Sequence, residues 1–130
     1  MKKEILIITL TIFLIGFISA EVLNVDNTVP CSDVTGTPYC TIQAAINAAS
    51  NGDTINVVAG TYTDVTDGVI SCPTSFADKA IVCVNKSLRL TGNSVAVIDG
   101  NGAFASGFVV SSSDVIIEGF EVMDFANGIP

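Results

Sequence analysis

Residues 41–64 read TIQAAINAASNGDTINVVAGTYTD, and the hydrophobic period of this stretch changes halfway along it. The apolar residues of its first half follow the spacing i, i+3, i+4 and i+7, which places them on one face of an α-helix. They are Ile42, Ala45, Ile46 and Ala49. In the second half Ile55, Val57 and Ala59 alternate with their neighbours, which is the spacing of a β-strand. The stretch therefore predicts a short helix followed directly by a strand.

Both ends of the predicted helix carry suitable capping residues. Thr41 can cap its N-terminus, and Asn51-Gly52 supplies a left-handed stop. About two to three turns are too few for a helix to be stable alone. We therefore expect its apolar face to dock on the rest of the protein.

Beyond residue 86 the sequence predicts a series of short strands separated by Gly, Asn, Asp and Ser. The runs are 87–90, 95–98, 108–110, 115–117 and 120–122. The segment SLRLTGN (87–93) returns as DVIIEGF (114–120), which indicates repeating coils of parallel strands. Alternation predicts that Val115, Ile117, Phe120 and Val122 point inward. It predicts that Ile116, Glu118 and Glu121 point outward, with Leu88 and Leu90 beneath Val115 and Ile117.

The segments 41–64 and 87–130 resemble the N-terminal entry of the pectate-lyase-like right-handed β-helix superfamily. The resemblance implies an all-β fold, a right-handed parallel β-helix whose open end is covered by a short capping α-helix. A β-sandwich of antiparallel hairpins is the alternative. The expected division is a signal peptide at 1–20, an irregular segment at 21–40, and the cap and first coils at 41–130. Because the sequence stops inside an expected coil, we expect a fragment of a longer solenoid.

The first twenty residues have the order of a secretory signal. Lys2 and Lys3 precede the uncharged apolar run 5–18, and Ser19-Ala20 offers small residues before a cut after Ala20. The alternative is an uncleaved membrane anchor, for which the apolar run is short. We expect a secreted or cell-surface protein that meets a membrane only through this export signal.

Four cysteines follow, an even number that favours disulfides in an exported chain. Three connectivities are possible, and the local pairs Cys31–Cys40 and Cys72–Cys83 are preferred because each closes a turn-rich loop. A zinc site is the alternative, but the spacings do not match those of CxxC motifs.

The composition excludes several chemistries. With 5 Lys and Arg against 13 Asp and Glu, the chain has a net charge of −8 and would repel nucleic acid. It has no histidine, which rules out imidazole catalysis or ligation within these residues. We expect no catalytic, cofactor or metal residues here. The turn 99–102, Asp-Gly-Asn-Gly, resembles the start of a calcium loop but lacks further acidic ligands.

Function is open at this point. Glu118 and Glu121 are the surface acidic candidates, and solvated charge explains them without a catalytic role. We expect a non-catalytic protein that binds polysaccharide or a cell-surface glycan, or that acts in adhesion. A spacer holding another domain away from the cell is possible as well. The alternative is the N-terminal part of a polysaccharide lyase or glycoside hydrolase whose active site lies beyond residue 130.

Overall fold

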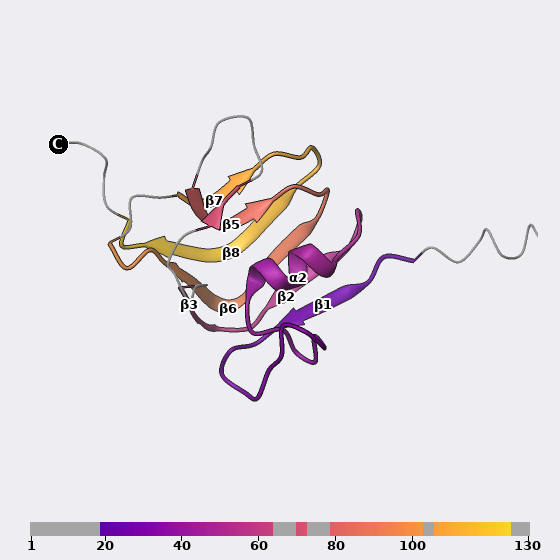
Figure 1. The fold of residues 1–130 in the computed structure, drawn as a ribbon, viewed down its shortest axis with the longest axis horizontal. Coiled ribbons are helices and arrows are strands. Elements are labelled where there is room, and N and C mark those ends of the chain that lie inside the picture. Colours follow the sequence, from indigo (N-terminus) through magenta and orange to yellow (C-terminus); the bar gives the residue numbers. More distant parts are fainter. Residues whose placement is uncertain (1–18, 64–69, 73–78, 103–105, 126–130) are drawn as a thin grey trace, which may run out of the picture.

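The computed structural model describes residues 19–63, 70–72, 79–102 and 106–125 and contains two β-sheets and one short helix (Figure 1). The larger sheet has five parallel strands: β1 (Val22–Val25), β2 (Thr54–Val57), β3 (Gly60–Tyr62), β6 (Arg89–Asp99) and β8 (Ile116–Met123). The smaller sheet has three: β4 (Ile70–Ser71), β5 (Lys79–Val84) and β7 (Ser106–Val110). The helix is α2 (Ile42–Ala48).

Strand β6 organises the larger sheet. Leu90 lies opposite Ile55 of β2 on one edge and opposite Ile117 of β8 on the other. Further along, β3 replaces β2 as the neighbour of β6, while β8 continues beside it. The pairing of Leu90 with Ile117 confirms the return register that the sequence predicted.

The right-handed parallel β-helix expected from the sequence is wrong. The described strands form two separate sheets and close no coil, and β4 pairs antiparallel with β5. The physical reason lies in β6: Gly92-Asn93 was expected to end a strand, but β6 runs through it from Arg89 to Asp99. The fold is therefore mixed, with a parallel sheet, a small second sheet and a helix. The sandwich alternative does not hold either, because β4–β5 is the one antiparallel pair among the described strands.

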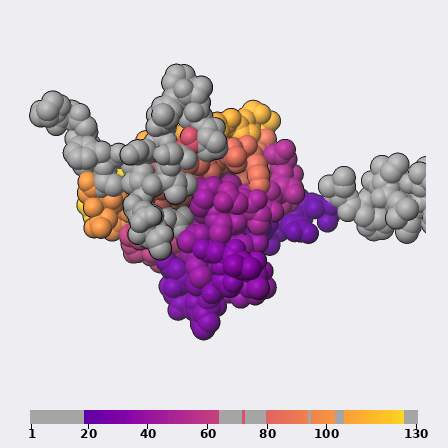
Figure 2. Space-filling model, viewed as in Figure 1, coloured from indigo at the N-terminus to yellow at the C-terminus, as the bar shows by residue number. Residues whose placement is uncertain are grey.

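The core joins both sheets and the helix. Its buried members include Val25, Ile55, Val57, Val82, Val84, Leu90 and Ile98. The helix contacts β1, β2 and β5, and all four residues expected on its apolar face are at most 5% exposed. Figure 2 shows that the chain up to β3 forms the lower part of the visible face and later residues the upper part.

The ends of α2 are held by side chains. Thr41 Oγ1 accepts the N–H of Ala44 at 3.2 Å, which confirms the expected N-cap. The expected left-handed stop is wrong, since the helix ends in an extended Ala49 and Gly52 lies in a later turn. Lys86 Nζ instead donates to the carbonyl oxygens of Ile46, Asn47 and Ala49 at 2.8, 2.9 and 2.6 Å. A cation there satisfies the last carbonyls and the negative end of the helix dipole.

Two disulfides link Cys31 to Cys40 and Cys72 to Cys83, the local connectivity. Cys72 and Cys83 pack with Ala80 and Val109 in a second cluster beside β5. Disulfides are typical of proteins that fold in an oxidising, extracellular environment.

Three expectations are changed or lie outside the description. The segment 21–40, expected to be irregular, contains β1, which pairs in parallel with β2. Val122 lies against the buried Gly107 of β7, which agrees with the expected inward direction, but it is 49% exposed because β8 forms the edge of the sheet. Val115, Ile117 and Phe120 pack partly on the core. The apolar run of the expected signal, 5–18, lies outside the described residues.

Candidate binding face

The outer face of the larger sheet carries one polar side chain from each of four strands in a single row. The register sets Asn24 of β1 beside Asn56 of β2, Asn56 beside Thr91 of β6, and Thr91 beside Glu118 of β8. We call these four residues the polar row. Successive members are separated by the strand spacing of about 4.8 Å. The row arises because successive side chains of a strand point to opposite faces of the sheet, as in the burial pattern of Thr54–Val57.

Hydrogen bonds organise the row but leave acceptors and donors for a ligand. Asn56 Nδ2 donates to Asn24 Oδ1 at 3.0 Å, and Thr91 Oγ1 donates weakly to the Ile55 carbonyl at 3.5 Å. The Asn56 Oδ1 atom and the Asn24 amide hydrogens have no partner in the described part of the chain. The row therefore presents both donors and acceptors to solvent.

An ion pair stands at the β8 end of the row. Arg89 donates from Nε and Nη2 to Glu118 Oε1, at 3.1 and 2.5 Å. The two side chains are 51% and 49% exposed, so the pair adds at most about 1 kcal/mol to stability. Both bonds end on Oε1, so Glu118 Oε2 accepts none from the described residues. The pair fixes the direction of a carboxylate whose second oxygen stays available.

Of the two acidic candidates from the sequence, only Glu118 joins this arrangement. Glu118 lies opposite Thr91, whereas Glu121 lies opposite Val97, beyond the turn of the backbone at Gly119. The structure thus separates them along β8. Both are exposed, as expected.

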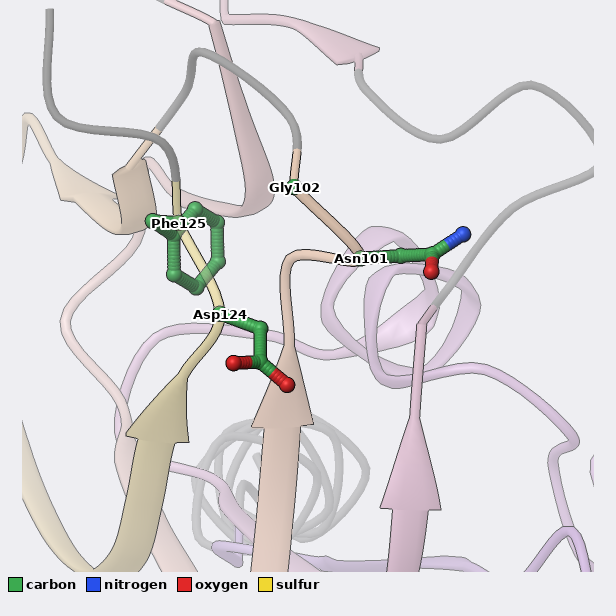
Figure 3. A pocket seen from close by; sticks show the side chains of 4 residues that line it. All are labelled: Asn101, Gly102, Asp124 and Phe125. Carbon is green, nitrogen blue, oxygen red and sulfur yellow. The ribbon is translucent and has the colours of Figure 1, made fainter.

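A shallow hollow of about 340 Å³ lies at the carboxyl ends of β6 and β8, lined by Asn101, Gly102, Asp124 and Phe125 (Figure 3). Figure 3 shows the Phe125 ring and the Asp124 carboxylate on one side of the loop and the Asn101 amide extending to the other. The side chains therefore do not converge on a common point.

The Asp-Gly-Asn-Gly segment beside this hollow forms a tight turn. Asp99 Oδ1 accepts the N–H of Asn101 at 2.8 Å, and Asn101 and Gly102 have φ of 47° and 77°. Within the described residues no group of three or more His, Cys, Asp or Glu side chains is placed to hold a metal ion. The calcium suggestion thus gains no ligand set from the structure.

Three members of the polar row were not predicted from the sequence: Asn24, Asn56 and Thr91. The signal was present in Thr54–Val57, where polar residues alternate with buried ones, and more weakly in β1, where the exposed Asn24 precedes the buried Val25. What the sequence lacked was the register that aligns these strands.

In the described part of the chain no helix is long and apolar enough to cross a membrane.

Comparison with protein-family models, curated proteins and solved structures gives no match to the chain. The comparisons therefore place it in no family, and the superfamily suggested by the sequence receives no support from them.

Proposed function

We propose that the protein is exported and binds a neutral glycan on the outer face of its larger sheet, without catalysing a reaction. The observation that carries this proposal is the polar row, one side chain from each of four parallel strands in register. A regularly spaced row of amides, hydroxyl and carboxylate suits a ligand with many hydroxyl groups that both donate and accept hydrogen bonds. The two disulfides fit an extracellular site of action.

Exposed apolar residues support a sugar as the ligand. Val22 and Ile116 stand at the two ends of the neighbouring row and are 63% and 49% exposed. A sugar ring has apolar C–H faces as well as hydroxyl edges, so a mixed surface of this kind complements it. The net charge of −8 disfavours acidic polysaccharides, which makes a neutral glycan the better fit.

The test is a glycan array with neutral and uronic-acid oligosaccharides, followed by titration of any hit. We expect binding to neutral chains, and a loss of about five- to tenfold in affinity for Asn56→Ala, because one or two hydrogen bonds disappear. Arg89→Ala should weaken binding similarly, since it releases the Glu118 carboxylate from its fixed direction.

The matched control is Asn47→Ala, an exposed asparagine on α2, which should bind like the unmodified protein. Absence of binding to every glycan, or equal loss in Asn47→Ala and Asn56→Ala, would contradict the proposal. Release of unsaturated or shortened oligosaccharides by the protein would contradict the absence of catalysis.

A further inference from the structure

The buried carboxylate of Asp53 holds the backbone nitrogen of Glu21, the first residue after the expected cleavage point. Asp53 is 5% exposed, and its Oδ1 accepts the Glu21 N–H at 2.8 Å. Its Oδ2 accepts the N–H of Ser50, also at 2.8 Å. Asp53 is the one charged residue that is buried in the described part of the chain. It binds the backbone immediately before β1.

The anchored point is where the chain joins the sheet. The Thr54 N–H donates to the Glu21 carbonyl at 2.9 Å, and Val22 begins β1 opposite Thr54. A hollow of about 410 Å³ lies here, and its lining includes Ser19, Ala20, Glu21, Ser50 and Asp53. Residues 19–21 are exposed. The Ala20–Glu21 bond and the carboxylate therefore border the same water-accessible space.

We propose that removal of the leader after Ala20 creates an α-ammonium group at Glu21 that pairs with the Asp53 carboxylate, so that processing locks the N-terminus onto the sheet. The reaction is hydrolysis by an export peptidase. Water adds across the Ala20–Glu21 bond, Ala20 leaves with the leader as a carboxylate, and the Glu21 nitrogen takes up protons to become an ammonium. A neutral hydrogen-bond donor at 2.8 Å from a buried carboxylate thereby becomes a cation.

The other charged groups near Asp53 do not compete with the Glu21 ammonium for its carboxylate. The positive charge of Lys86 lies close enough to lower the pKa of Asp53. Its Nζ, however, donates to three carbonyl oxygens at the end of α2. Glu21 is exposed, so its side-chain carboxylate is solvated. Backbone hydrogen bonds from Glu21 and Ser50 hold the pKa of Asp53 below its ordinary value against the opposing effect of burial, so the carboxylate is charged at neutral pH.

Pairing has a consequence for pH dependence. A free α-amino group has a pKa of about 7.7–8.0, and a carboxylate in contact with the ammonium should raise this pKa. A raised folded-state pKa gives stability that is fully present below the ordinary value and is lost as pH rises through the raised one. The processed protein should therefore lose stability on the alkaline side.

The experiment uses the full chain expressed in an exporting host. N-terminal sequencing of the secreted product should give Glu21. The pKa of its α-amine is then measured from the pH dependence of acylation, read at the N-terminal peptide, and should lie clearly above the ordinary range of about 7.7–8.0. Thermal unfolding between pH 7 and 10 should show a drop in melting temperature from this group, because its contribution to stability is lost as the ammonium loses its proton.

The matched control inserts one glycine between Ala20 and Glu21. After processing, the Glu21 N–H remains an amide that can still donate to Asp53, while the ammonium is moved one residue away. Its amine should titrate at about 7.7–8.0 and the alkaline drop should shrink. An N-terminus other than Glu21, or an ordinary amine pKa in the unextended protein, would overturn the proposal. Because neither measurement involves a glycan, failure here is distinct from failure of the binding face.

Discussion

Two glycines, Gly92 and Gly119, allow strands β6 and β8 to touch backbone to backbone. Residues 92–95 of β6 face Gly119 alone on β8, so the sheet has a bulge at this point. Gly119 has φ of +78°, and a Cβ built on it would overlap the carbonyl oxygen of Gly92. A side chain here would therefore be strained and would also separate the strands.

Gly119→Ala should lower the free energy of unfolding by at least about 3 kcal/mol, the sum of left-handed strain and the lost strand contact. Gly102→Ala is the matched control, because Gly102 has nearly the same φ, +77°, but open space where a Cβ would lie. It should cost about 1–2 kcal/mol. Urea unfolding of both variants measures the difference. Equal losses would show that the backbone contact does not matter.

Asp53 gives the fold an acid-side pH dependence. Its folded-state pKa lies below the ordinary value of 3.8, because it accepts the backbone N–H groups of Glu21 and Ser50. A depressed pKa contributes stability above the ordinary value that is lost as pH falls through the folded value. Unfolding curves between pH 6 and 2 should therefore show a loss that Asp53→Asn lacks. A variant with the same acid profile as the unmodified protein would contradict this role.

Lys86 closes the C-terminus of a helix that has no basic residue in its own last turn. Lys86→Met keeps the aliphatic stem but removes the donor to three carbonyl groups. We expect a loss of about 1–3 kcal/mol in the free energy of unfolding, measured in urea. The neighbouring exposed change Asn85→Ala should stay within about 0.5 kcal/mol. A similar small effect for Lys86→Met would mean that water caps the helix equally well.

At the scale of elements, the buried face of α2 holds the helix on β1, β2 and β5. Ile46 is fully buried, so Ile46→Asp would place an unpaired charge in the core and should cost more than about 3 kcal/mol or cause aggregation. Asn47→Asp adds the same charge on the exposed side. It should change the melting temperature little. A soluble Ile46→Asp protein with an unchanged melting temperature would refute the docking of this face.

The sequence predicted single elements better than their extent. The helix over Ile42–Ala48 followed from the apolar period, and the pairing of Leu90 with Ile117 followed from the repeat of SLRLTGN in DVIIEGF. The continuity of β6 through Gly92 and Asn93 did not follow from the sequence. Gly92 and Asn93 have the composition of a turn, but β3 and β8 continue the pairing of β6 beyond them. Tertiary pairing overrode local preference there.

At the scale of the whole molecule, the missed continuity accounts for the wrong fold class. A break at Gly92 would have turned the chain into the next side of a coil, whereas the continuous β6 keeps residues 89–99 in one sheet. The polar row was not predicted from the sequence for a related reason. Glu118 and Glu121 were chosen as a pair, but the polar row depends on the alignment of four strands distant in sequence, which one sequence without register cannot provide.

The same alignment supports both the proposed binding face and the glycine contact, and nuclear Overhauser spectroscopy of the labelled protein tests it directly. We expect the contacts of a parallel ladder that place Ile55 beside Leu90 and Leu90 beside Ile117. Close Hα–Hα contacts of antiparallel pairs among β2, β6 and β8, or a register shifted by one residue, would contradict it, because a one-residue shift would turn the polar row into the core.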